Sequence, residues 1–180
     1  MNRFSMTICA VCASLAAPAM FGQAKQAPPP QTEIAALKAS YAAIKNNVSK
    51  AADQMPENEY SFKASPDIRT FGELIGHIAD AQARFCAIAG GTTPPNESYE
   101  KTKTAKADLV AALKSSFDTC DSVFNSLSDD DISKMVTVGR GSRSKTALLW
   151  TLIIGHSNEE YGYLSVYMRL KGHVPPSSQR

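Results

Sequence analysis

The stretch that decides the fold is residues 144–172, SKTALLWTLIIGHSNEEYGYLSVYMRLKG. Its apolar side chains return every three or four residues, the spacing of a helix that packs one face in a core, and this face runs through Leu149, Leu152, Ile153, His156, Glu160, Tyr163 and Tyr167. Ser144 is suited to cap the start of this helix, and Pro175 with Pro176 prevents its continuation. The pattern predicts one long helix whose core-facing side carries an imidazole and a carboxylate.

Three earlier segments have the same helical spacing, and two of them carry end signals. Residues 32–55 place Ile34, Leu37, Tyr41, Ile44 and Val48 on one face; residues 69–91 do so with Leu74, Ile78, Ala81, Phe85 and Ile88; residues 104–128 do so with Leu109, Leu113, Phe117, Cys120, Phe124 and Leu127. Thr32 is suited to cap the first segment, while Thr70 with Glu73 forms a capping-box signature in the second. The chain is therefore expected to be all-α, a four-helix bundle, with a short extended piece in MVTVGRGSRS before the last helix.

The N-terminus reads as a targeting segment. Residues 1–24 contain a positive start, an apolar stretch and a small-residue ending, as signal peptides do. Residues 25–31 are a Pro-rich spacer, and residues 32–176 form the folded domain. A periplasmic or secreted protein is expected, with no integral membrane association after cleavage.

The charge balance argues against nucleic acid as a partner. The formal net charge is only +2 at pH 7, whereas nucleic-acid binding draws on clustered positive charge. The local cluster of Arg140, Arg143 and Lys145 is expected to be a solvated loop, with contact to an anionic surface as the alternative.

Cysteine positions bear on the topology. Cys9 and Cys12 lie inside the export signal, which leaves Cys86 and Cys120 as a disulfide candidate in an oxidising compartment. Each follows the start of its helix by the same number of residues. In a flush antiparallel hairpin the two would be offset by about 18 Å along the axis, too far for a disulfide. We therefore predict that the second and third helices run parallel and are joined by a crossover; two buried free thiols are the alternative.

Histidines on two helices suggest a metal site. His77 lies beside the apolar stripe of the second helix, and His156 and Glu160 share one face of the fourth because residues four apart lie on one side of a helix. Two imidazoles and one carboxylate suit Zn²⁺, and also Fe²⁺ or Ni²⁺. Glu159 could replace Glu160 as the ligand. Alternatively, His156 and Glu160 only form a hydrogen bond with each other at a solvent-exposed end of the bundle.

Two segments, RTFGELIGHIADAQARFC and LLWTLIIGHSNEEYGYLSVYMRLKGHVPP, resemble the second and fourth helices of DinB-like (DinB/YfiT-like) proteins. The resemblance implies a four-helix bundle in up-down-down-up order, with a crossover between helices two and three. It also implies a divalent metal held by three histidines. By position the first is His77 and the second is His156, but the third falls on Glu160, which departs from the family pattern.

The sequence thus predicts an exported DinB-like protein with a mononuclear divalent-metal site on His77, His156 and Glu160. Its activity would be metal-dependent hydrolysis or group transfer on a small molecule. Glu159 would act as a general base or as a residue that contacts the ligands of the metal. A homodimer is compatible with this interpretation. The alternative is a non-catalytic, ligand-binding or structural bundle whose metal site is vestigial.

Overall fold

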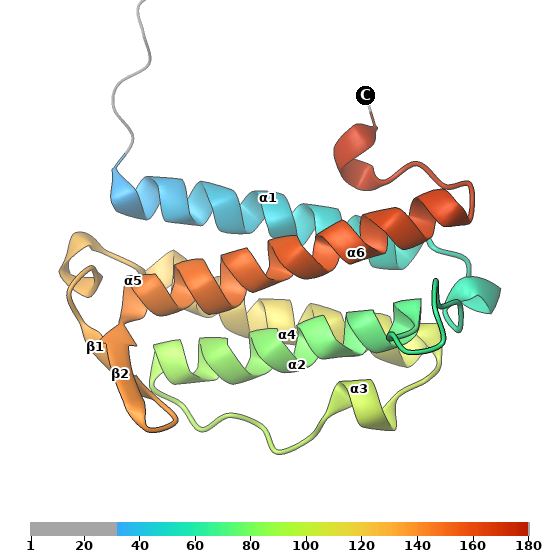
Figure 1. The fold of residues 1–180 in the computed structure, drawn as a ribbon. Helices are drawn as coiled ribbons and strands as arrows, with labels where there is room; N and C mark the ends of the chain where they lie inside the picture. The colour runs from blue at the N-terminus through green and yellow to red at the C-terminus, as the bar shows by residue number, and fades with distance from the viewer. Residues whose placement is uncertain (1–31, 180) are drawn as a thin grey trace, which may run out of the picture. The chain divides into compact units, whose positions relative to one another are not determined.

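The computed structural model describes residues 32–179, so the predicted signal peptide and spacer lie outside the described part of the chain. The fold is mostly helical, with four main helices and one small hairpin (Figure 1). The main helices are α1 (Glu33–Gln54), α2 (Phe71–Gly90), α4 (Lys106–Ser126) and a last helix built from α5 (Lys145–Leu148), a π-helical stretch (Leu149–Gly155) and α6 (His156–Leu170). The shorter elements are α3 (Tyr99–Thr102), β1 (Met135–Val138), β2 (Gly141–Ser144) and the 3₁₀ turns Glu57–Glu59, Asp129–Asp131 and Pro176–Ser178.

The helix ends follow the local signals in the sequence. The Thr32 hydroxyl accepts a hydrogen bond from the Ala35 amide at 3.2 Å and so caps α1. Thr70 and Glu73 form a reciprocal capping box at the start of α2. This helix ends at Gly91, whose φ of +74° is a left-handed conformation that glycine adopts without a steric penalty.

The hairpin occupies the segment expected to be extended. β1 and β2 pair antiparallel, with Met135 opposite Ser144 and Val138 opposite Gly141. A buried ion pair anchors the hairpin, because Lys145 Nζ lies 2.8 Å from Asp131 Oδ1 in the preceding turn. The chain is therefore not purely all-α, although its core is helical.

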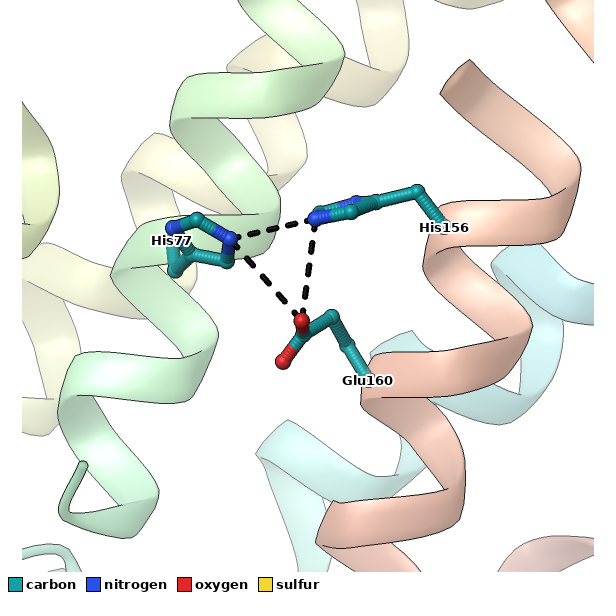
Figure 2. A group of neighbouring side chains, drawn as sticks. All are labelled: His77, His156 and Glu160. Carbon is teal, nitrogen blue, oxygen red and sulfur yellow. Dashed lines mark hydrogen bonds and ion pairs between the residues drawn. The ribbon is translucent and has the colours of Figure 1, made fainter. Parts of the chain in front are cut away.

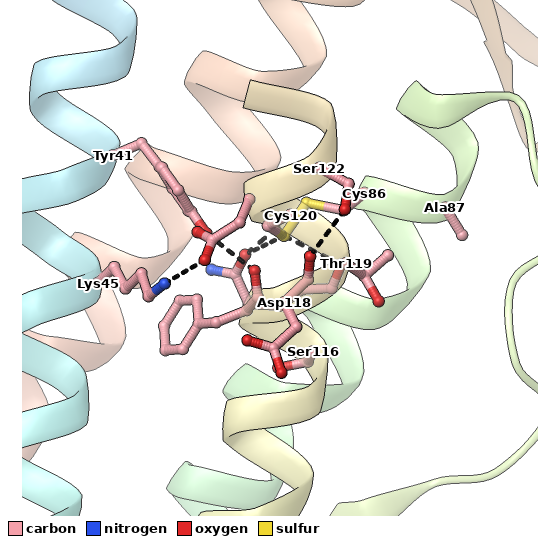
Figure 3. Close-up of a disulfide and its surroundings, with 12 residues drawn as sticks. Tyr41, Lys45, Cys86, Ala87, Ser116, Asp118, Thr119, Cys120 and Ser122 are labelled. Carbon is pink, nitrogen blue, oxygen red and sulfur yellow. Dashed lines mark hydrogen bonds and ion pairs between the residues drawn. A yellow bond between two sulfur atoms is a disulfide. The ribbon is translucent and has the colours of Figure 1, made fainter. Parts of the chain in front are cut away.

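Parallel packing of α2 and α4 is visible in Figure 1, where both run away from the end of the bundle at which α3 lies. The connection between them returns along α2 and includes α3. The predicted disulfide joins Cys86 on α2 to Cys120 on α4, with the two Cα atoms 5.0 Å apart (Figure 3). Both cysteines are fully buried, so the bond crosses the core between these two helices.

The last helix departs from the regular pattern that the sequence suggested. Its π-helical stretch, Leu149–Gly155, ends directly before His156, and a π turn accommodates an extra residue. Beyond it, Glu160 and Tyr167 are buried as expected, together with Ser157, Tyr161, Leu164, Ser165 and Met168. Tyr163, also expected on the buried face, is 47% exposed. Within residues 32–179 no helix has the length and apolarity needed to cross a membrane.

Candidate metal centre

Three side chains converge between α2 and α6 (Figure 2). His77 Nε2 lies 3.1 Å from His156 Nε2 and 3.8 Å from Glu160 Oε1, and His156 Nε2 lies 3.6 Å from the same carboxylate oxygen. Each residue offers one ligand atom, and all three atoms lie within 4.8 Å of one another. The structure therefore brings together the three residues that the sequence suggested as ligands.

The spacing of these atoms suits a small divalent cation. Tetrahedral Zn²⁺ with bonds of about 2.0–2.2 Å holds neighbouring donor atoms roughly 3.3–3.6 Å apart. The three observed separations, 3.1, 3.6 and 3.8 Å, bracket this range. The chemistry of the donor set, two imidazole nitrogens and one carboxylate oxygen, also fits Zn²⁺, Fe²⁺ or Ni²⁺.

Burial sets the protonation of this group. Burial lowers the pKa of His156, and the neighbouring His77 adds to that effect, so the neutral imidazole, the form that binds metals, is favoured. Burial also raises the pKa of Glu160, which makes an uncompensated carboxylate costly there. A bound cation would supply the missing positive charge.

Two atoms of the group are buried without a hydrogen-bond partner in the described part of the chain: His156 Nδ1 and Glu160 Oε2. Such unpaired polar atoms are rare in folded proteins and are costly. The two Nε2 atoms also face each other at 3.1 Å, a contact that needs a hydrogen on one of them. A cation between the three side chains would interact with the two Nε2 atoms and with the Glu160 carboxylate, so the group fits a metal.

Two residues that the sequence analysis missed lie on the Nδ1 side of His77. Glu100 Oε2 lies 2.9 Å from His77 Nδ1, and Glu100 Oε1 accepts a hydrogen bond from Arg69 Nε at 2.7 Å. Burial opposes ionisation of Glu100, but the hydrogen bonds from Arg69 and His77 outweigh it and lower the pKa of this carboxyl. Neither residue lies on the helical stripe of a histidine, so residue spacing gave no signal for them.

Glu159 lies on the exposed side of α6. Its carboxylate accepts a hydrogen bond from the Tyr163 hydroxyl at 3.3 Å. The structure does not bring Glu159 into the group formed by His77, His156 and Glu160. Its role as a general base therefore remains a prediction.

A cleft of about 690 Å³ opens next to Arg69 and Glu100, and none of the three candidate ligands lines it. Arg69 and Glu100 belong both to its lining and to the hydrogen-bonded chain that reaches His77. The remaining lining mixes charged, aromatic and apolar side chains, namely Lys63, Pro66, Asp67, Ile68, Glu73, Leu74, Tyr163 and Tyr167. This size and mixture suit a small organic molecule.

A comparison with known protein families finds a match that covers most of the chain. Residues 40–163 match the model of the DinB superfamily, a span that contains all three side chains of the candidate centre. Among proteins with curated descriptions, none matches this chain.

Solved structures with a similar fold include two DinB-like proteins. One, from Bacillus cereus, is 18% identical and has a TM-score of 0.66 over 78% of this chain and 93% of its own. The other, from Bacillus subtilis, is 22% identical and has a TM-score of 0.63 over 81% of this chain and 99% of its own. A conserved protein from Enterococcus faecalis, 14% identical, has a TM-score of 0.61 over 75% and 94% of the two chains. At these identities the matches support the fold alone.

Proposed function

This chain belongs to the DinB superfamily, and from that premise we propose that it is an exported metalloprotein with one divalent cation held by His77, His156 and Glu160. The observation that carries the proposal is the convergence of three ligand atoms within 4.8 Å. Support comes from the unpaired Glu160 Oε2, a buried oxygen for which a cation is a natural partner. We propose Zn²⁺, Ni²⁺ or Fe²⁺, with metal-dependent hydrolysis or group transfer as the reaction class.

The same proposal includes the order and direction of the four main helices. We assign the main helices the order up, down, down, up, with the crossover between the second and third. The short distance between the Cys86 and Cys120 Cα atoms, 5.0 Å, supports this order because each cysteine lies well along its own helix. The crossover matters for function because it carries Glu100 to His77.

We place the substrate, a small molecule, in the cleft lined by Arg69 and Glu100. Arg69 can orient a polar group there because only its Nε donor is used by Glu100, and Leu74 and Tyr167 offer apolar contact. When bound, a divalent cation acts as a Lewis acid on an oxygen of a reacting group. Glu159 is the proposed proton acceptor, supported by its bond to Tyr163, which lines the cleft.

Export is proposed from the N-terminal segment, residues 1–24. A disulfide in the core supports this location, because cytosolic proteins usually keep their thiols reduced. Fractionation of producing cells, with N-terminal sequencing of the purified protein, tests this part. A protein that is found in the cytosol and still begins at Met1 would contradict this part of the proposal.

The metal content of the purified protein tests the central claim. After incubation with Zn²⁺, Ni²⁺, Fe²⁺ or Mn²⁺ and removal of free ions, mass spectrometry should find ~1 equivalent of metal per chain. His77→Ala and His156→Ala should each lose it. His173→Ala is the matched control, since His173 bonds Glu59, outside the centre.

The result also separates the proposal from its alternative. A wild-type protein that retains less than about a tenth of an equivalent of every ion would indicate a bundle whose site is vestigial. A metal that survives both histidine substitutions would place the site elsewhere. Metal retained by the wild type and by His173→Ala alone would support the centre and justify a search for turnover.

A further inference from the structure

We infer that Glu100, on the crossover between α2 and α4, is a positioning residue that holds His77 with its Nε2 atom turned toward the metal group. The inference rests on the proposed function, because it gives the crossover a part in the same centre. Its basis is the contact between Glu100 Oε2 and His77 Nδ1, 2.9 Å long. Three features of the structure show that this contact is built into the fold.

The first feature is a carboxylate that seats the crossover on α2. Asp80 Oδ1 accepts a hydrogen bond from the Tyr99 amide at 2.6 Å, and Asp80 Oδ2 accepts from the Glu100 amide at 3.2 Å and from the Ser98 hydroxyl at 2.8 Å. One side chain thus binds three consecutive residues at the start of α3. Because Asp80 lies one turn after His77 on α2, the backbone of Glu100 is fixed relative to that histidine.

The second feature is a glycine that permits close approach. A Cβ atom at Gly76 would lie 2.7 Å from Glu100 Cα and 2.8 Å from the Glu100 amide nitrogen. Both distances are shorter than real side chains allow, so only glycine fits at this position with the crossover where it is. Gly76, the residue directly before His77, therefore allows the Glu100 backbone to lie against α2.

The third feature is the way both carboxylate oxygens are used. An ionised carboxylate only accepts hydrogen bonds, so the 2.9 Å contact requires the hydrogen to be on His77 Nδ1. The Nε2 lone pair, which faces His156 and Glu160, is then free to bind a cation. Arg69 Nε holds the other oxygen at 2.7 Å and keeps the carboxylate in place. Carboxylates behind metal-binding histidines commonly fix the ring in this way.

Glu100→Gln tests the inference. The amide offers only one acceptor oxygen for both His77 and Arg69, and its NH₂ group can donate to His77 Nδ1 and so favour the opposite tautomer. We expect Zn²⁺ to bind about 10- to 100-fold more weakly, measured by competition with a chromophoric chelator. Glu97→Gln is the matched control, because Glu97 lies on the same crossover and pairs with Lys103 instead; its affinity should not change.

A second readout needs no metal. Long-range ¹H–¹⁵N spectra of the metal-free protein distinguish the two imidazole tautomers, and His77 should carry its hydrogen on Nδ1 in the wild type and in Glu97→Gln. Glu100→Gln should lose that preference. Unchanged affinity within about twofold, or weakened affinity with an unchanged His77 tautomer, would overturn the inference. If the wild type bound no metal, the proposed function would fail, whereas the tautomer would still show whether Glu100 controls the ring.

Discussion

Gln82 on α2 donates a hydrogen bond from Nε2 to the Ser157 hydroxyl on α6 at 2.6 Å. Both residues are almost completely buried. The Gln82 Oε1 atom faces Cys120 Sγ on α4 at 2.8 Å, so one amide touches two other helices (Figure 3 shows the disulfide region). Ser157 directly follows His156, and the contact therefore links the histidine-bearing helices close to the candidate centre.

Ser157→Ala should destabilise the fold. The substitution removes the only hydroxyl partner that the structure gives Gln82 Nε2, and an unsatisfied buried amide costs about 1–3 kcal/mol in the free energy of unfolding. Urea unfolding followed by circular dichroism measures this loss. Ser122→Ala, at an exposed position of α4, is the control and should change stability by less than about 0.5 kcal/mol. Equal stability of both variants would contradict the argument.

Much of the helical framework was predictable because it depends on local patterns. The cap at Thr32, the capping box at Thr70 and the apolar spacing of the main helices act over a few residues, and the structure confirms them. The Cys86–Cys120 bond was also predictable, since equal positions on two helices constrain their direction. The π-helical stretch was not predictable, because no residue type within it requires an extra residue per turn.

The centre was predictable only as far as helical phase reaches. His156 and Glu160 share a face by their spacing, but the contact of Glu100 with His77 depends on how the crossover folds back. The path of the crossover along α2 depends on Gly76 and Asp80. The contacts of these two residues with the crossover can be recognised only in the folded structure. Tyr163 was misplaced on the buried face, whereas Glu160 and Tyr167 of the same predicted stripe are buried as expected.

Loss of the disulfide should lower stability without removing the fold. The two cysteines are 34 residues apart in the sequence, and closing a loop of this length stabilises a domain by roughly 3–4 kcal/mol on the chain-entropy model. The double variant Cys86→Ala, Cys120→Ala should lose about this amount in urea unfolding. Thiol titration of the denatured, unreduced wild-type protein should find no free thiol from this pair. Two reactive thiols in the exported protein would contradict the prediction.

Acid should weaken the anchor of the hairpin. A hydrogen bond from Lys145 and one from the Ser128 backbone lower the pKa of Asp131. Because the folded-state pKa lies below the unfolded value of about 3.9, the stabilisation is present above that value and is lost as pH falls through the folded pKa. Asp131→Asn should remove this part of the acid dependence.

The same variant has an effect at neutral pH. It leaves the buried Lys145 ammonium without its carboxylate partner, which should cost about 3 kcal/mol. Denaturant unfolding at several pH values measures both effects. Asp129→Asn, in the same turn but exposed, is the control. An unchanged slope of stability with pH below about 4 in Asp131→Asn would contradict the assignment.

Glu160→His tests whether the carboxylate completes the centre or stands where a ligand is missing. Imidazole favours Zn²⁺ and Ni²⁺, whereas a carboxylate ligand also suits Mn²⁺. If Glu160 is a ligand, Glu160→His should still bind Zn²⁺, and its preference for Zn²⁺ over Mn²⁺ should rise about tenfold or more. Glu159→His, on the exposed side of α6, should leave the preference unchanged. Metal binding that appears only in Glu160→His would show that the carboxylate had abolished the site; an equal effect of both variants would place the third ligand elsewhere.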